Sequence, residues 1–150
     1  MSQHGVQTVH YGEPFPASEP VLYFLGPTWF PKTEIHWHNQ GLAHLAKRRF
    51  RGTVALPTPR DGVWREEDED EQIQWQLLGQ GIARVIIMWA SRDSEVTKIE
   101  FGQWYSTGKL VMGLLSETPI ASYMRKCAKL YDVPTAPILE EVINLGLAKL

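Results

Sequence analysis

The residue best suited to chemistry is Glu100, in the string Lys98-Ile99-Glu100-Phe101-Gly102. Ile99 and Phe101 should face the core, so the carboxylate between them should be partly desolvated, while a helix N-terminus and Lys98 favour its ionised form. An anionic carboxylate in a dry crevice can attack an electrophilic carbon. The alternative interpretation is a solvent-facing helix glutamate beside Lys98.

Polar and aromatic residues elsewhere suggest a binding site for a sugar and a base. Arg60 and Asp61 follow an apolar run, and their side chains either hold sugar hydroxyls or form an Asx-turn beside an exposed arginine. Trp29, Phe30 and Trp64 either stack a nucleobase or serve only in packing. Both interpretations stay open for each group.

Metal ligation has weaker support. Glu34, His36 and His38 alternate as ligands sometimes do, but an H-x-H string without a third ligand at motif spacing favours a surface loop. Cys127 is the only cysteine, so no disulfide forms within the chain. We expect no metal and no cofactor.

The overall composition narrows the class of partner. The 150 residues carry a formal net charge of -2 and 43% apolar residues, enough for one sizeable core. A balanced charge argues against polymeric nucleic acid and an anionic membrane as partners, but not against a nucleoside or nucleotide. The N-terminal residues lack the pattern of a signal peptide, and no apolar run is long enough to span a membrane. We expect a cytoplasmic protein.

The elements that position Glu100 are a buried strand at 85–90, a polar loop, and a helix-like string from Val96 to Lys109 with Gly108 as its stop. Apolar runs predict further strands at 21–25, 53–56 and 110–115. Helical spacing predicts helices at about 37–50, 71–83, 121–132 and 137–150. Strands separated by helices indicate a parallel sheet. We therefore expect a doubly wound, flavodoxin-like α/β sandwich of three layers, with four or five mainly parallel strands.

The pattern also predicts the domain organisation and which faces are buried. Residues 1–20 should be an irregular arm with a short extended piece at 7–11 and little of the core, before a single domain at 21–150. In the second helix Ile73, Leu77 and Leu78 should point inward. The helix at 137–150 is apolar on most of its circumference, so we expect it to contact a second subunit in a homo-oligomer.

Four motifs occur in order between these strands, and they resemble the nucleoside 2-deoxyribosyltransferase-like family over about residues 21–115. They are Phe24-Leu25-Gly26-Pro27, then Pro59-Arg60-Asp61-Gly62 with Trp64, then the acidic stretch before Gln74-Trp75, and finally Ile99-Glu100-Phe101-Gly102 with Gly108-Lys109. The resemblance implies a retaining transfer at the anomeric carbon of a deoxynucleoside, with Glu100 as the nucleophile that holds the sugar as an ester. Its motifs contain Gly26, Pro27, Arg60, Asp61 and Trp64, which we predict as substrate contacts together with Trp29 and Phe30.

The sequence departs from the family pattern where acids are usual. The central strand opens with Ala83-Arg84 in place of Ala-Asp, and Gln76 follows the tryptophan of the second helix. Asp93 is the candidate proton donor in the loop before the nucleophile, although Ser94 and Glu95 compete for that register. Arg84 either contacts a substrate phosphate or is a solvated charge at the sheet edge.

These departures leave two functions to compare. One is deoxyribosyl transfer or hydrolysis on a deoxynucleoside or deoxynucleotide through Glu100. The other is a nucleoside- or nucleotide-binding module that keeps the fold without turnover.

Overall fold

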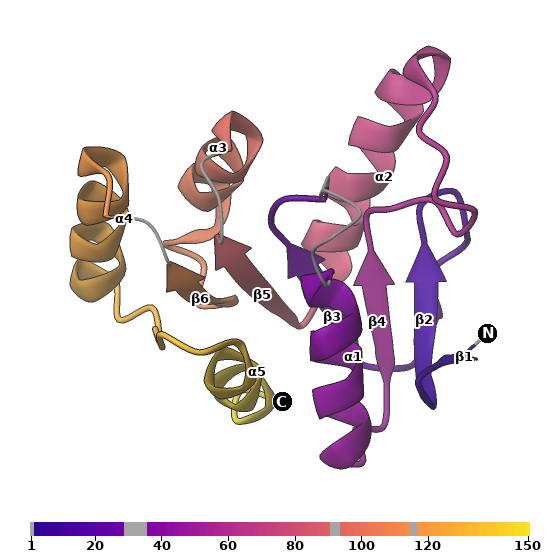
Figure 1. The fold of residues 1–150 in the computed structure, drawn as a ribbon, viewed down its shortest axis with the longest axis horizontal. Helices are drawn as coiled ribbons and strands as arrows, with labels where there is room; N and C mark the ends of the chain where they lie inside the picture. Colours follow the sequence, from indigo (N-terminus) through magenta and orange to yellow (C-terminus); the bar gives the residue numbers. More distant parts are fainter. Residues whose placement is uncertain (1, 29–35, 91–93, 115–116) are drawn as a thin grey trace. The chain divides into compact units, whose positions relative to one another are not determined.

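The computed structural model describes residues 2–28, 36–90, 94–114 and 117–150. Within them, six strands and five α-helices follow one another along the chain (Figure 1). The chain divides into two compact units, residues 1–24 with 30–84 and residues 25–29 with 85–150. The strands are mostly parallel, so the predicted α/β class is confirmed.

The strands of the first unit are β1 (Ser2–Gln3), β2 (Val6–His10), β3 (Val21–Leu25) and β4 (Thr53–Leu56). They lie in the order β1-β2-β4-β3. The short β1 is antiparallel to β2, whereas β2 and β3 each pair in parallel with β4. Because β2 and β4 start together at Gln7 and Thr53, their carboxyl ends, His10 and Leu56, meet at one edge.

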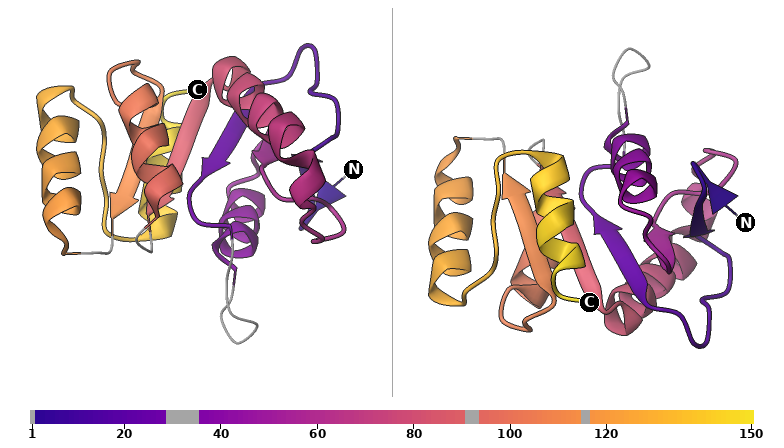
Figure 2. Two further views of the ribbon diagram at one scale, coloured as in Figure 1. Left: turned by 90° about the horizontal axis from the view of Figure 1, so that it is seen from above. Right: turned by 90° about the horizontal axis from the view of Figure 1, so that it is seen from below.

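Two helices cover the strands of the first unit on opposite faces (Figure 2). They are α1 (Trp37–Lys47) and α2 (Glu69–Ile82), the latter preceded by a 3-10 turn at Glu66–Asp68. α1 ends before the predicted residue 50. Arg49 there adopts a left-handed φ of 54°, and the Phe50 N–H donates to the Leu45 carbonyl oxygen, so arginine takes the place that glycine usually has at a helix end.

The second unit contains β5 (Val85–Ala90) and β6 (Leu110–Leu114), which pair in parallel from Ile86 and Leu110 onward. Its helices are α3 (Glu95–Trp104), α4 (Pro119–Leu130) and α5 (Leu139–Leu147). α3 and α5 lie on opposite faces of the two strands (Figure 2). In each unit helices therefore sandwich the strands, as the predicted three-layer architecture requires.

The N-terminal arm differs from its prediction. Residues 6–10 form the buried strand β2, in which Val6, Thr8, Val9 and His10 are all buried. The short extended piece expected there is real, but the expectation of an irregular arm with little core is wrong. The reason is nonlocal, because β2 gains its burial by pairing with β4, more than forty residues later in the chain.

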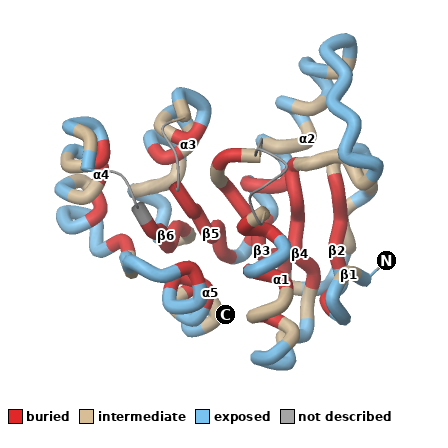
Figure 3. The backbone as a smooth tube through the Cα atoms, viewed as in Figure 1, coloured by how far each residue is buried: buried red, intermediate tan, exposed pale blue. Residues whose placement is uncertain are grey.

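The inward face of α2 also differs from its prediction. Ile73, Leu77 and Leu78 are exposed, whereas Gly79 and Gln80 are buried. Figure 3 shows that most of the length of α2 is exposed or half-buried. The inner contact is made by Trp75, which stacks on Phe15 with ring centroids 4.7 Å apart. The inner face of α2 is thus formed by Gly79, which allows a close approach, and by one large aromatic ring. The aliphatic side chains that the sequence pattern predicted there do not form it.

α5 uses most of its apolar surface within the chain. Leu139, Val142, Ile143 and Gly146 are buried, and the helix packs on β5 and β6. The apolar circumference that predicted a second subunit is therefore explained largely by these two strands. Ile138, just before the helix, remains 51% exposed.

Candidate functional site

The predicted site residues fall into three groups. Gly26, Pro27 and Glu100 belong to the second unit, and Arg60, Asp61, Trp64 and Arg84 to the first. Trp29, Phe30 and Asp93, together with Glu34 of the H-x-H string, lie outside the described residues. Each unit therefore holds its own part of the predicted set.

Glu100 lies on α3, the helix that follows β5. Ser94 caps this helix by accepting a hydrogen bond from the Thr97 backbone N–H at 3.3 Å, and Thr97 and Phe101 form its buried face. Glu100 is half-buried. The prediction that both apolar neighbours face the core is wrong for Ile99, which is 64% exposed, and right for Phe101.

Glu100 lies on a helix that starts after the carboxyl end of a strand. Lys98 forms an ion pair with Glu95 at 3.0 Å, one turn nearer the N-terminus. Gly26 and Pro27 follow the end of β3, and Pro27 is buried while Gly26 is half-buried. In open α/β sheets, ligands bind outside the carboxyl ends of the strands, and Glu100 and Gly26-Pro27 both follow such ends.

Arg60 is half-buried and held by Glu13 on the loop after β2. Its Nε donates to Glu13 Oε1 at 2.5 Å and its Nη2 to Oε2 at 2.9 Å, while Nη2 also lies 3.3 Å from the Thr8 carbonyl oxygen. Hydrogen bonding from Arg60 lowers the pKa of the Glu13 carboxyl to about 2. Arg60 is therefore engaged in an ion pair at one end of the first unit. This ion pair competes with the predicted contact between Arg60 and a sugar hydroxyl.

Asp61 forms the Asx-turn that was one of its two interpretations. Its Oδ1 accepts from the Val63 backbone N–H at 2.9 Å, and its Oδ2 accepts from Arg65 Nη2 at 2.9 Å. The Val63 N–H and then Arg65 lower the pKa of the Asp61 carboxyl. Trp64 between them is 40% exposed, as a stacking platform requires.

Arg84 is the residue just before β5. Its backbone N–H donates to the Val21 carbonyl oxygen at 2.9 Å, and its side chain is exposed. This arrangement favours the solvated edge charge over a buried phosphate contact.

Sequence reasoning missed the buried imidazole of His10, at the carboxyl end of β2. Its Nδ1 lies 3.1 Å from the Thr58 carbonyl oxygen, which requires a proton on Nδ1 and leaves a lone pair on Nε2. Nε2 is buried without a hydrogen-bond partner among the described residues. No local pattern in Val6 to His10 indicated this placement, because the string is half polar and does not alternate.

His38 is the second buried imidazole of the first unit, in the first turn of α1. Its Nε2 is likewise buried without a partner in the described part of the chain, and its ring packs against those of Trp37 and Phe24. Burial lowers its pKa well below the usual range, with smaller contributions from His36 and His10. Two neutral imidazoles near the carboxyl edge of the first unit could accept protons or bind a small polar group.

The H-x-H string has a structural role. His36 is the N-cap of α1, and its Nδ1 accepts from the His38 backbone N–H at 3.2 Å. Across the residues that the structure describes, no group of three or more His, Cys, Asp or Glu side chains is arranged to hold a metal ion.

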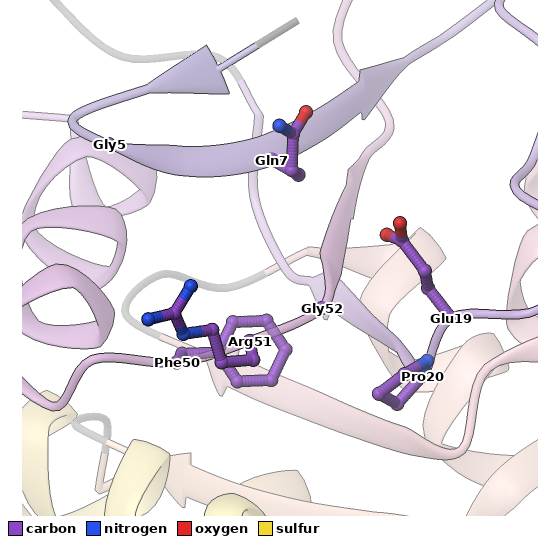
Figure 4. A pocket seen from close by; sticks show the side chains of 7 residues that line it. All are labelled: Gly5, Gln7, Glu19, Pro20, Phe50, Arg51 and Gly52. Atoms are coloured by element: carbon purple, nitrogen blue, oxygen red, sulfur yellow. The ribbon is translucent and has the colours of Figure 1, made fainter.

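Two hollows lie elsewhere. One of about 370 Å³ sits where β2, β3 and β4 begin, and Gln7, Glu19 and Arg51 supply polar groups around it (Figure 4). It is at the amino edge, opposite the edge where α/β folds bind ligands. The other, of about 300 Å³, is in the second unit beside the Glu117–Arg125 ion pair. Glu100 lines neither of them.

Comparisons with known proteins do not extend this picture. No protein-family model matches the chain, and no curated protein does. Among the described helices, none has the length and apolarity needed to cross a bilayer. The class of protein that the structure defines is thus a mixed α/β protein with mainly parallel strands.

Proposed function

We propose that the chain acts on the N-glycosidic bond of a deoxynucleoside or deoxynucleotide, by deoxyribosyl transfer or by hydrolysis. The observation that carries the proposal is the half-buried Glu100 on the helix directly after β5. A carboxylate there is partly desolvated, yet open enough to meet a substrate. The resemblance of the Ile99-Glu100-Phe101-Gly102 string and of its companion motifs gives the proposal its substrate class.

The reaction has two steps. A Glu100 carboxylate oxygen bonds to the anomeric carbon while the bond from that carbon to the base nitrogen breaks, and the departing nitrogen takes up a proton. In the second step a second base, giving transfer, or water, giving hydrolysis, attacks the same carbon while the bond from that carbon to the Glu100 oxygen breaks. The Glu100 carboxylate is released, and the attacking nitrogen or water oxygen gives up a proton. We propose Asp93 as the acid that protonates the departing base.

A nucleoside- or nucleotide-binding module without turnover is the second candidate. Two observations favour it. Arg60 and Asp61, both predicted substrate contacts, are engaged by Glu13 and by Arg65 within the chain. Residues 84 and 76 are Arg and Gln where acids are expected.

Covalent capture distinguishes the two candidates. Incubation with a 2-fluoro-2-deoxy nucleoside, followed by intact mass and peptide mapping, should add one fluorodeoxyribosyl group to Glu100. Gln103→Ala is the matched control, because Gln103 is an exposed polar residue on the same helix and its loss should leave the adduct unchanged. Binding of the analogue without any adduct would reject the covalent mechanism and support the module.

Transfer and hydrolysis are separated by a second measurement. Labelled free base is added to unlabelled nucleoside, and its incorporation is compared with release of free sugar. Faster incorporation indicates transfer, whereas sugar release without incorporation indicates hydrolysis.

The setting of this activity is also part of the proposal. A single cysteine, which cannot form a disulfide within the chain, favours the cytoplasm. A homo-oligomer formed through residues 137–150 stays a prediction, with Ile138 as the clearest exposed apolar residue in that segment.

A further inference from the structure

The hollow at the amino edge of the first unit is lined by residues from three segments of the chain. Gln7 lies on β2, Glu19 and Pro20 lie just before β3, and residues 50–52 lie just before β4. Its volume of about 370 Å³ falls near the lower limit for ligand pockets, which have volumes of about 300–1,000 Å³. The hollow therefore suits a small organic molecule.

Opposite charges lie on two sides of this hollow. Figure 4 shows the guanidinium of Arg51 and the carboxylate of Glu19 on opposite sides of Gly52. In the part of the chain that the structure describes, neither side chain forms an ion pair. Thr53 is paired with Val21 in adjacent strands, and each charged residue lies two positions before one of them. Both charges are therefore close to one edge, where a single small molecule can contact them.

The carboxylate of Glu19 is held in place by a buried hydroxyl group. Thr53 is buried, and its Oγ1 donates a hydrogen bond to Glu19 Oε2 at 2.8 Å. Among the described residues, no group donates to the other oxygen, Oε1. Glu19 Oε1 is therefore available to accept a hydrogen bond from a cationic group such as an ammonium.

The apolar part of the lining comes from Phe50 and Pro20. A Cβ built at Gly52 would lie 2.6 Å from Phe50 Cζ and 3.1 Å from Pro20 Cγ. The glycine therefore allows both rings to pack closely against the backbone at the base of the hollow. Phe50 is half-buried and lines the hollow, so it offers an apolar surface beside the charged groups. An apolar part of a ligand can pack on this surface.

Positive charge is concentrated on the Arg51 side. Four basic residues occur within five positions there, although the chain as a whole is slightly acidic, and they are Lys47, Arg48, Arg49 and Arg51. None of these side chains forms an ion pair with another described residue. Their summed field attracts an anionic group to this side of the hollow. Glu19 on the other side attracts a cationic group.

We propose that this hollow binds an α-amino acid with an apolar side chain, in its zwitterionic form. Arg51 binds the α-carboxylate, and Glu19 Oε1 accepts a hydrogen bond from the α-ammonium. The side-chain amide of Gln7 donates a further hydrogen bond to the α-carboxylate. The apolar side chain of the ligand packs on Phe50. This binding site goes beyond the proposed glycosidic chemistry and does not depend on it.

Titration of the full chain with L-leucine, followed by amide-resolved NMR spectra, tests the proposal. The backbone amides of Gly5, Gln7 and Gly52 should shift along one saturable curve, with a dissociation constant below about 1 mM. The amide of Gly108, in the second unit, should not shift. Shifts confined to other residues, or the absence of saturation at about 10 mM, would overturn the proposal.

Two variants and two ligand analogues test the charge assignment. Glu19→Gln keeps an oxygen that can accept from Thr53 but removes the negative charge. It should raise the dissociation constant of leucine about tenfold without weakening the binding of N-acetyl-leucine, which has no ammonium. Arg51→Gln should raise the dissociation constants of leucine and N-acetyl-leucine about tenfold. It should not weaken the binding of leucinamide, which has no carboxylate.

Arg48→Gln and Glu66→Gln are the matched controls, because both residues are exposed and neither lines the hollow. Each control should change the dissociation constant of leucine less than about twofold, because exposed charges at a distance are screened by salt. Glu19 and Arg51 are also exposed, so their variants should unfold as cooperatively as the wild type. If either variant binds leucine as the wild type does, or weakens all three ligands equally, the assignment of the two charges is wrong.

Discussion

The guanidinium of Arg60 donates two hydrogen bonds to the carboxylate of Glu13, from Nε to Oε1 at 2.5 Å and from Nη2 to Oε2 at 2.9 Å. The two residues are 47 positions apart and join the loop after β4 to the loop after β2. The Glu13 backbone carbonyl oxygen also accepts from Trp75 Nε1 at 2.9 Å. One residue of the N-terminal arm thus connects the loop after β4 and the helix α2.

This ion pair predicts a pH-dependent contribution to stability. The pKa of Glu13 is about 2 in the folded protein and near its ordinary value of 4.5 in the unfolded chain. The contribution is therefore complete above about pH 5 and is lost as the pH falls through 4.5 toward 2. Glu13→Gln should cost about 1 kcal/mol in the free energy of unfolding at pH 7, since the pair is partly solvent-screened.

Urea denaturation of the wild type and of Glu13→Gln at a series of pH values measures this effect. The gap between the two free energies should shrink steadily below pH 4.5. Glu117→Gln, which removes an exposed acid from the ion pair with Arg125, is the control. A gap that stays constant down to pH 2.5 would show that the carboxylate is not stabilised by Arg60.

The buried imidazole of His38 predicts that the free energy of unfolding changes with pH in the neutral range. Burial lowers its pKa below the ordinary 6.5, so the unfolded chain binds a proton first as the pH falls. Stability is then full above about pH 6.5 and decreases below it, by up to about 1.4 kcal/mol per pH unit for one such group.

His38→Phe tests this slope because phenylalanine cannot titrate and its ring can pack against Phe24 and Trp37. The free energy of unfolding of this variant, measured between pH 7 and pH 5, should fall less steeply than that of the wild type. Equal slopes for His38→Phe and wild type would contradict the prediction.

A close packing contact in the second unit gives a steric prediction. A Cβ built at Gly113 lies 2.5 Å from Trp89 Cζ3 and 2.9 Å from Val142 Cγ2. Gly113→Ala should therefore lower the free energy of unfolding by about 1–3 kcal/mol. Trp89→Phe removes Cζ3, so alanine at 113 should cost less in that background; an equal cost in a double-mutant cycle would exclude the clash as its cause.

The central strands were predictable because their signals are local. Continuous apolar runs bounded by Gly, Pro or charged residues predicted 21–25, 53–56 and 85–90, and the strands have these bounds. The extent of β2 was not predictable, because Val6-Gln7-Thr8-Val9-His10 is short and half polar and depends on a distant partner, β4. Local pattern was thus sufficient only where a strand is apolar along its whole length.

The site was predictable to a smaller degree for the same reason. The Asx-turn at Asp61 is a local motif, and one of its two predicted interpretations was that turn. The partner of Arg60 is distant in sequence, and so is the Phe15 ring that sets the inner face of α2. Sequence patterns can identify such residues but not the distant residues that they contact. Those contacts determine whether a charge or an apolar face can still bind a ligand.

The last prediction concerns Glu100 itself. Its side chain is half-buried on α3, outside the buried face formed by Thr97 and Phe101, so Glu100→Ala should change the free energy of unfolding by less than about 1 kcal/mol. Loss of a covalent nucleophile should nevertheless reduce kcat/KM for nucleoside cleavage at least about 10³-fold. Formate, a small carboxylate, should restore part of the activity of the alanine variant, because it can occupy the vacated position and attack the same carbon. Gln103→Ala, at an exposed position of the same helix, should retain full turnover. A Glu100→Ala variant with wild-type kcat/KM would remove Glu100 from the mechanism.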